Sequence, residues 1–442
     1  MDKISAKDLT IPNFGPGTIW SPLHRLGEGG ENSGNFVEDN QRVLLDDTLE
    51  GVNESLARNE PLPSFEMAGP RSKIFFDPDK TACGIVTCGG ICPGLNDVIR
   101  GLVMQLNYRY GVRRIYGFRY GYEGFIREYG HPVETLTPES VRDLHRFGGT
   151  FLGTSRGPQD TGMILDRLQN LGINVLFVIG GDGTLRGALD ISHEAHKLSR
   201  IVSVIGIPKT IDNDILFMDK SFGYETAFAA AVNTIQCSHT EALGSRNGVG
   251  LVKLMGRHSG FIACSAALST NDVNFVLIPE VPFALEGEKG LLESLRRRIE
   301  SRRHAVIVVA EGAGQDLIQN AGEGADLSGN LRLKDIGMFL KDRIERYFKG
   351  RSMEINLKYI DPSYIIRSVP ASPQDSGYCM RLAQAAVHAA MAGKTAMLVA
   401  RWHGHFVHLP IPIATTGRRR VDPKGDLWQS VLESTGQPEP LR

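Results

Sequence analysis

The chain has 442 residues, of which 41% are hydrophobic and 22% are charged, and its formal net charge is −1. This length and this ordinary globular composition predict two packed domains, each with a sizeable core. The balanced charge excludes a whole-chain attraction to nucleic acid or to an anionic membrane surface, and no run of about 18 apolar residues predicts a membrane span.

Cysteine is sparse, with six residues in the chain. Three of them, Cys83, Cys88 and Cys92, lie in or beside one apolar segment and its glycine-rich turn. Cys88 and Cys92 resemble half of a metal site, but no second close Cys or His pair accompanies them, so buried thiols are the preferred interpretation. This cysteine usage fits a reduced, cytoplasmic setting best.

Residues 1 to about 80 are rich in Gly, Pro, Asn and acidic residues and show little helical periodicity. Turn signals occur at Gly15–Gly17 and at Gly27–Gly30. We interpret residues 1–76 as an N-terminal extension. It is either a disordered tail or an arm wrapped on the body, and the apolar run Ile74-Phe75-Phe76 favours the arm.

After the extension the sequence alternates between apolar strands, glycine-rich turns and amphipathic helices. Thr81–Thr87 leads into the turn Gly89–Asn96, which a helix follows. Further strands, with helical stretches between them, are predicted at Val112–Gly117, Val175–Ile179 and Ile201–Ile207. Consecutive strands joined through helices predict a parallel sheet.

A second set of strands is predicted at Gly248–Leu254, Phe275–Ile278 and Ala305–Ala310, and each is followed directly by polar residues. A late strand, Ala396–Arg401, would return to one of the two sheets. Open α/β sheets bind ligands beyond the carboxyl ends of their strands, and two such sheets facing each other would form a cleft. The predicted fold class is therefore α/β with two parallel-rich sheets.

Two short segments carry most of the chemical information: Gly180–Thr184 and Pro208–Asp214. Each follows an apolar run, so parallel strands would deliver both to the same edge of a sheet. Glycines let backbone N–H groups approach phosphate oxygens, one carboxylate can hold Mg²⁺, and a second can accept a proton from an attacking hydroxyl. Together the two segments predict a phosphoryl-transfer site.

Within these segments, Asp182 is a candidate Mg²⁺ ligand, and its alternative role is an Asx turn or a cap of a helix at Leu185–Leu189. Asp212 and Asp214 are two residues apart, so an extended backbone would place them on one side of the chain. We assign Asp212 as a general base and Lys209 as the group that stabilises charge on the phosphoryl group.

Other basic residues are weaker signals. Arg257 follows a predicted strand, where it could bind a phosphate or a hydroxyl, although an isolated arginine is more often a surface ion-pair partner. The run Tyr359–Arg367 has the pattern of a loop and a strand, except that Lys358, Tyr364 and Arg367 together could grip a phosphate monoester. The preferred interpretation is a solvated helix face for the arginine runs at 296–298 and 302–303, and a loop for the run at 418–420. Whether the basic residues near Arg297 and Arg419 bind a regulatory phosphate stays open.

Taken in order, the motifs resemble the signature of the 6-phosphofructokinases, from about Lys73 to about Ala400. The matching residues are Gly89-Gly90 with Pro93–Asn96, Gly180–Thr184, Pro208–Asp214, Met255–Arg257, Pro279-Glu280, Glu311-Gly312 and Tyr364–Arg367. The resemblance implies a glycolytic enzyme that transfers a phosphoryl group to the 1-hydroxyl of fructose 6-phosphate with Mg²⁺. It also implies an allosteric homotetramer in which two Rossmann-like domains enclose a cleft.

The resemblance further implies a division of the chain into four parts. These are the N-terminal extension at 1–76, an ATP-binding domain at 77–222 that is completed by about 365–420, a fructose 6-phosphate-binding domain at 223–364, and a C-terminal tail at 421–442.

Carried over position by position, the resemblance implies that Asp212 is the base and that Lys209, Thr210 and Arg257 also take part in catalysis. The sugar would be surrounded by Thr210, Asp212, Asp214, Met255, Gly256, Arg257 and Glu311, and its 6-phosphate would be held by Lys358, Tyr364 and Arg367. The donor side matches Gly90, Arg156, Asp182, Gly183 and Thr184, with Asp182 toward the metal. Lys358 stands where many members have arginine, and Arg246 is displaced from the place of an arginine that a neighbouring subunit often contributes.

The identity of the phosphoryl donor is the main open question, because the sequence mixes two patterns. Lys209 resembles the pyrophosphate-using branch, whereas Gly183 resembles the ATP users, since the pyrophosphate branch typically has a second Asp there. A side chain at 183 would intrude on the α-phosphate of a nucleotide, so we predict ATP as the donor. Three competing hypotheses are a pyrophosphate-dependent enzyme, a nicotinamide-nucleotide or lipid kinase, and a catalytically silent sugar-phosphate-binding regulatory subunit.

Overall fold

The computed structural model describes residues 4–26, 36–318, 324 and 332–441. The expected turn at Gly27–Gly30 lies outside these residues. Contacts divide the chain into two compact units. Unit 1 comprises Met1–Thr210, Ile215–Gly223 and Pro370–Gly417, and unit 2 comprises Ile211–Asp214, Tyr224–Val369 and Arg418–Arg442. The chain therefore passes between the units within the Pro208–Asp214 motif itself.

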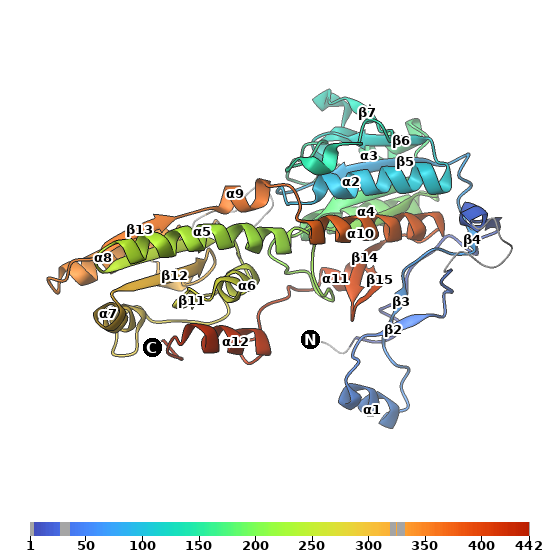
Figure 1. Ribbon diagram of the computed structural model, residues 1–442. Helices are drawn as coiled ribbons and strands as arrows, with labels where there is room; N and C mark the ends of the chain where they lie inside the picture. The colour runs from blue at the N-terminus through green and yellow to red at the C-terminus, as the bar shows by residue number, and fades with distance from the viewer. Residues whose placement is uncertain (1–3, 27–35, 319–323, 325–331, 442) are drawn as a thin grey trace. The chain divides into compact units, whose positions relative to one another are not determined.

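Unit 1 is built on a nine-stranded sheet in the order β2-β3-β15-β14-β9-β8-β5-β6-β7 (Figure 1). Its strands, with the separate pair β1 and β4, are β1 (Ile19–Trp20), β2 (Arg42–Leu44), β3 (Ser64–Met67), β4 (Lys73–Ile74), β5 (Ala82–Thr87), β6 (Arg114–Phe118), β7 (Val133–Thr135), β8 (Val175–Gly180), β9 (Ser203–Pro208), β14 (Met397–Trp402) and β15 (His405–Pro410).

The α-helices of unit 1 are α1 (Leu49–Ala57), α2 (Leu95–Met104), α3 (Thr161–Asn170), α4 (Asp182–Lys197), α10 (Pro373–Met391) and α11 (Ile411–Ala414). Helix α2 continues into a π-helical turn, η2 (Gln105–Tyr110), and the short 3₁₀ segments are η1 (Pro22–Leu26), η3 (Gly121–Phe125), η4 (Arg127–Tyr129) and η5 (Leu144–Arg146). Helix α10 packs on α2, β9 and β14, while α4 packs on α3, β8 and β9.

Unit 2 contains a four-stranded parallel sheet in the order β11-β12-β10-β13. Its strands are β10 (Gly248–Leu254), β11 (Phe275–Leu277), β12 (His304–Ala310) and β13 (Asn356–Ile360). Its helices are α5 (Tyr224–Gly244), α6 (Phe261–Thr270), α7 (Leu291–Arg302), α8 (Ile336–Lys349), α9 (Ser363–Ser368) and α12 (Asp426–Thr435), with the short 3₁₀ segment η6 (Gln315–Leu317). None of the helices in the described part of either unit is both long and apolar enough to cross a lipid bilayer.

The predicted strands all form, with ends that shift by one or two residues at several of them. The predicted fold class, α/β with parallel-rich sheets, is confirmed. In unit 1 the parallel strands β14, β9, β8, β5 and β6 are joined at the two edges by β15, β3, β2 and β7 in antiparallel pairs, so this sheet is mixed. One expectation needs correction. The run Tyr359–Arg367 is the end of β13 followed by helix α9, instead of a loop and a strand.

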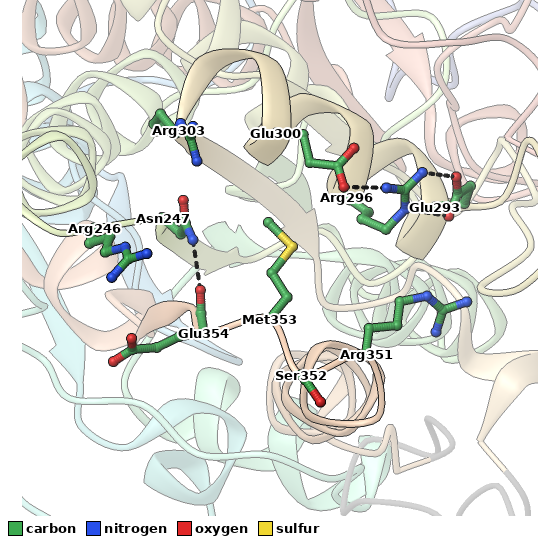
Figure 2. Close-up of a pocket in the computed structure, with 10 residues that line it drawn as sticks. All are labelled: Arg246, Asn247, Glu293, Arg296, Glu300, Arg303, Arg351, Ser352, Met353 and Glu354. Carbon is green, nitrogen blue, oxygen red and sulfur yellow. Dashed lines mark hydrogen bonds and ion pairs between the residues drawn. The ribbon is translucent and has the colours of Figure 1, made fainter.

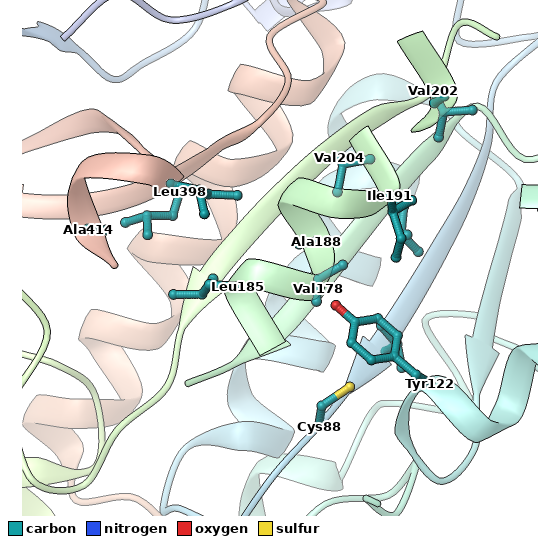
Figure 3. Close-up of a cluster of buried hydrophobic side chains, with 14 of the residues drawn as sticks. Cys88, Tyr122, Val178, Leu185, Ala188, Ile191, Val202, Val204, Leu398 and Ala414 are labelled. Carbon is teal, nitrogen blue, oxygen red and sulfur yellow. The ribbon is translucent and has the colours of Figure 1, made fainter. Parts of the chain in front are cut away.

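Helix α4 is anchored by the main core of unit 1. Its apolar face, with Leu185, Ala188 and Ile191, is buried against strand residues such as Val178 and Val204 (Figure 3). Burying such side chains stabilises a fold by roughly 1.5–3 kcal/mol each. The helix begins at Asp182, three residues before the predicted start, so its first turn carries the Gly180–Thr184 motif.

The N-terminal extension is held on unit 1 by a buried cluster of charged side chains. Glu66 of β3 forms ion pairs with Arg71 at 2.8 Å and with Lys394 at 2.9 Å. His408 of β15 lies 2.9 Å from the same carboxylate oxygen. Burial opposes ionisation of Glu66, but His408 and Lys394 outweigh it and hold the pKa of this carboxyl at about 2. Part of the extension is thus an arm tied to the last strands of the sheet.

We expect Lys394→Met to destabilise the protein by roughly 3 kcal/mol, because the buried Glu66 carboxylate would lose one of its two cations. The midpoint of thermal unfolding should fall by about 5 °C or more. Since Glu66 has a lowered pKa, its contribution is present above its unfolded pKa, near pH 4.5, and is lost as the pH falls toward 2.

Lys80→Met is the matched control, because Lys80 pairs with Asp77 at the exposed surface. Its unfolding midpoint should match the wild type within about 1 °C, as expected for surface ion pairs. Equal midpoints for the two variants would contradict the role of the buried cluster.

Candidate functional site

Three parallel strands of unit 1 end at the predicted donor motifs. Strands β5, β8 and β9 are neighbours and run in the same direction, so their carboxyl ends share one edge of the sheet. Beyond β5 lies the Gly89-Gly90 turn, beyond β8 lies the Gly181–Thr184 segment, and β9 ends at Pro208, directly before Lys209. The sheet therefore brings the motifs of unit 1 together, as parallel strands must.

Lys209 links two of these turns. Its buried side chain donates a hydrogen bond from Nζ to the carbonyl oxygen of Gly90 at 2.6 Å, and its backbone N–H donates to the carbonyl oxygen of Gly180 at 3.0 Å. Gly89 has φ +82°, a left-handed conformation that favours glycine, and a Cβ there would lie 3.3 Å from the ammonium group. The lysine charge is thus fixed at the glycine-rich edge where phosphate would bind.

The remaining donor-side residues lie at the same edge. The guanidinium of Arg156 is 3.8 Å from where a Cβ on Gly90 would be. The Tyr122 hydroxyl donates to the carbonyl oxygen of Thr184 at 2.7 Å, which fixes the first turn of α4. A Cβ on Gly183 would meet no protein atom within 4 Å. Packing within the protein therefore does not require glycine at 183, and the open space there is available to a ligand.

The donor set at this edge fits a magnesium ion better than a metal held in a protein cage. Asp182 is partly accessible at the first residue of α4. Among the described residues, no group of three or more His, Cys, Asp or Glu side chains is arranged to hold a metal. Mg²⁺ usually binds to one or two carboxylates, several waters and substrate phosphates, so a single carboxylate beside a glycine-rich turn fits this ion.

Unit 2 contains the predicted acceptor residues Asp212 and Asp214. The backbone N–H of Arg257 donates to Asp212 Oδ2 at 3.4 Å, and the Ser259 hydroxyl donates to the Asp212 carbonyl oxygen at 2.9 Å. The Asp212–Asp214 segment is thereby attached to the loop after β10. Thr210, which precedes it, belongs to unit 1, where its carbonyl oxygen accepts from the Ser221 hydroxyl at 2.5 Å.

The loops after β10 and β12 lie against each other. The backbone N–H of Glu311 donates to the Leu254 carbonyl oxygen at 2.9 Å, and that of Gly312 donates to Gly256 at 3.1 Å. Gly256 has φ +128°, which only glycine adopts readily. These bonds place Met255, Gly256, Arg257 and Glu311 at one edge of the sheet.

Three carboxyl groups at this edge influence one another. Burial raises the pKa of Asp212 to about 8, and the negative charges of Asp214 and Glu311 add to the effect. Burial also raises the pKa of Glu311, against the opposing charges of Arg257 and Lys253. A carboxylate with a raised pKa is a stronger proton acceptor once it is ionised, which suits a general base.

One residue near these carboxylates was missed in the sequence. Arg418 belongs to the 418–420 run, for which a loop was predicted, and the run is indeed a loop. The Arg418 guanidinium pairs with Asp214 Oδ2 at 2.6 Å. This partner lies 204 residues away in the chain, so no local pattern could identify it.

Of the three residues predicted to bind the 6-phosphate, Tyr364 and Arg367 lie together, whereas among the described residues no hydrogen bond, ion pair or ring contact joins Lys358 to them. Tyr364 and Arg367 share one face of α9 because they are three residues apart, and the guanidinium lies 4.6 Å from the tyrosine ring centroid. Arg367 Nε is buried, and no hydrogen-bond partner for it occurs in the described structure. Lys358 lies exposed in the middle of β13, and its place beside this pair stays a prediction.

A separate hollow of about 800 Å³ occurs in unit 2 (Figure 2). It is lined by Arg246, Asn247, Glu293, Arg296, Glu300, Arg303, Arg351, Ser352, Met353 and Glu354. Arg246 and Asn247 precede β10, and Arg303 precedes β12, so the hollow lies at the amino ends of these strands. It is therefore distinct from the edge that carries Met255–Arg257 and Glu311.

Sequence comparison identifies close relatives. The family model described as "Phosphofructokinase" matches residues 82–390. The chain is 51% identical over 437 residues to the ATP-dependent 6-phosphofructokinase of Amycolatopsis methanolica, a match that covers 98% of this chain and 95% of the relative. It is 49% identical over 420 residues to the enzyme of the same name from Borreliella burgdorferi, with 92% of each chain covered.

Solved structures with the same fold are more distant in sequence. The pyrophosphate-dependent phosphofructokinase of Marinobacter aquaeolei matches with a TM-score of 0.66 and 20% identity, over 80% of this chain and 91% of that one. Pichia pastoris phosphofructokinase matches with a TM-score of 0.62 and 21% identity, over 80% of this chain and 37% of that one. The fold agrees with that of these enzymes, and the family match spans well over half of the sequence. The chain belongs to the phosphofructokinase family.

Proposed function

We propose that the chain is an ATP-dependent 6-phosphofructokinase of glycolysis, which converts fructose 6-phosphate and ATP into fructose 1,6-bisphosphate and ADP. The observation that carries this proposal is the 51% identity, along nearly the whole chain, to a relative with that name. A cytoplasmic homotetramer is part of the proposal, by the same resemblance to the family.

In this proposal each unit supplies one side of the reaction. Unit 1 serves as the ATP-binding domain, expected at 77–222 and about 365–420. Unit 2 serves as the fructose 6-phosphate-binding domain, expected at 223–364, to which the contacts add Ile211–Asp214 and Arg418–Arg442. ATP binds at Gly90, Arg156, Asp182, Gly183 and Thr184. The sugar binds at Thr210, Asp212, Asp214, Met255, Gly256, Arg257 and Glu311, and its 6-phosphate binds at Tyr364, Arg367 and Lys358.

Phosphoryl transfer requires a group that accepts the proton of the 1-hydroxyl and cations that offset the negative charge of the phosphates. Asp212 takes the proton from the 1-hydroxyl as that oxygen attacks the γ-phosphorus of ATP, and the bond to the β-bridging oxygen breaks to release ADP. The ammonium group of Lys209 and the guanidinium of Arg257 offset negative charge on the transferring phosphoryl group. As a kinase of this family the protein needs a divalent cation, and we assign Mg²⁺: Asp182 would hold it, and the ion would offset negative charge on the donor phosphates.

A pyrophosphate-dependent enzyme is the second candidate, because Lys209 resembles that branch of the family. Parallel assays of fructose 6-phosphate phosphorylation with Mg-ATP and with Mg-pyrophosphate distinguish the two. We expect turnover with ATP and none with pyrophosphate. Product formed only with pyrophosphate would overturn the choice of donor.

Gly183→Asp tests the structural basis of the donor choice. Because the protein leaves open space at this position, the variant should fold as the wild type does, with an unfolding midpoint within about 2 °C. Its added carboxylate should repel the nucleotide phosphates and lower kcat/KM for ATP at least about 10-fold. Gly377→Asp, also at a position with open space, is the control and should leave kcat/KM for ATP unchanged.

Asp212→Asn tests the general base. We expect kcat to fall by about 10²-fold or more while the KM for fructose 6-phosphate changes little, since the amide cannot accept the proton. In the wild type, kcat/KM should rise with pH as Asp212 ionises through its raised pKa, and the variant should lose this rise.

Asp342→Asn provides the control for this prediction, because Asp342 is a half-exposed carboxylate paired with Arg346 on α8. It should retain the kcat and the pH profile of the wild type. Unchanged turnover in Asp212→Asn would remove the assigned role of that residue.

A further inference from the structure

The C-terminal segment that begins at Arg418 makes several contacts with unit 2 directly after the chain enters that unit. Arg418 pairs with the Asp214 carboxylate at 2.6 Å, and the backbone N–H of Arg419 donates to the Asp214 carbonyl oxygen at 2.8 Å. The guanidinium of Arg419 also lies 4.7 Å from the ring centroid of Phe261, at the start of α6. Both the backbone and the side chain of Asp214 are therefore held by this segment.

The same segment is linked to the loop after β10 through Glu280. One carboxylate oxygen of Glu280 accepts hydrogen bonds from the backbone N–H groups of Val421 and Gly260, each at 2.9 Å. Gly260 follows the Met255–Arg257 loop and immediately precedes α6. The C-terminal segment thus braces the Asp212–Asp214 loop and the neighbouring Met255–Gly260 loop.

Arg418 also acts through its positive charge, in addition to holding Asp214 in place. Asp214 and Glu311 disfavour ionisation of Asp212, whereas the Arg257 backbone N–H and the charge of Arg418 favour it. The nearby His258 does not offset the carboxylates, because burial and the charge of Arg418 lower its pKa, and Arg257 and Arg420 act in the same direction. Arg418 is therefore a cation that directly compensates Asp214, the carboxylate two residues from the proposed base.

We propose that Arg418 is a positioning residue of the phosphoacceptor site: its ion pair with Asp214 fixes that carboxylate and offsets its charge, so that Asp212 ionises more readily and can act as the proton acceptor. This inference rests on the proposed function, because it acts through the base assigned there. It predicts that loss of the Arg418 charge weakens the compensation of Asp214 and makes Asp212 harder to ionise.

The test compares Arg418→Gln with the wild type in the pH dependence of kcat/KM for fructose 6-phosphate at saturating Mg-ATP, from about pH 6 to about pH 9.5. Glutamine retains a hydrogen-bond donor but no charge. We expect the acid-side midpoint of the profile to rise by about one pH unit, so kcat/KM near pH 7 falls roughly 10-fold and recovers as the pH rises. Arg418→Lys, which keeps the charge, should retain most of the wild-type midpoint.

Two further variants separate this effect from a structural one. Lys424→Met removes a positive charge from the same segment, at an exposed residue, and should leave the midpoint unchanged. The double variant Asp214→Asn with Arg418→Gln removes both charges of this pair and should return the midpoint close to that of the wild type, even if its overall rate is lower. It also provides the readout if Arg418→Gln alone does not fold.

Each contrary outcome has a distinct meaning. A uniform loss of activity in Arg418→Gln, with the midpoint unchanged, would overturn the inference and leave only a structural brace. An equal shift in Lys424→Met would also overturn it, since the effect would then come from net charge. Failure of the proposed function shows separately, as a wild type that does not phosphorylate fructose 6-phosphate or as an active Asp212→Asn.

Discussion

The acceptor side of this protein depends on how one unit accommodates three carboxyl groups at a single edge of a sheet. Asp212 and Asp214 lie on one short segment, and Glu311 influences the same place from the end of β12. Such a group of like charges would protonate or move apart unless cations and backbone N–H groups balanced it. The balance here comes from the Arg257 backbone and from Arg418, and it leaves Asp212 with a raised pKa that suits a base.

The predicted donor side differs from this acceptor edge, because it presents glycine-rich turns with few charged side chains. Three parallel strands end at glycine-rich turns, and Lys209 ties two of those turns together through the Gly90 and Gly180 carbonyl oxygens. The first turn of α4 is held by the core of unit 1 and by the Tyr122 hydroxyl, so its geometry does not depend on a ligand. A Cβ on Gly183 would meet no protein atom within 4 Å, so glycine there is not required by packing, and its effect would be on which phosphoryl donor fits.

The N-terminal extension connects this edge to the rest of unit 1. Strand β3 pairs with β15, which pairs with β14, and β14 lies beside β9, the strand that leads to Lys209. The buried cluster around Glu66 joins the same strands through Lys394 and His408. The arm that the sequence favoured is therefore part of the sheet whose strand β9 leads to Lys209.

The sequence alone determined the strands, the glycine-rich turns and most of the candidate residues, because apolar runs and glycine or proline signals act over a few neighbouring residues. Residues such as Asp182, Lys209 and Asp212 could be named because each directly follows such a run. The tertiary structure decided what depends on distant partners. The pairing of Arg418 with Asp214 joins residues 204 positions apart, and the short helix α9 forms where local pattern favoured a strand, since so short a helix is stabilised by packing more than by propensity.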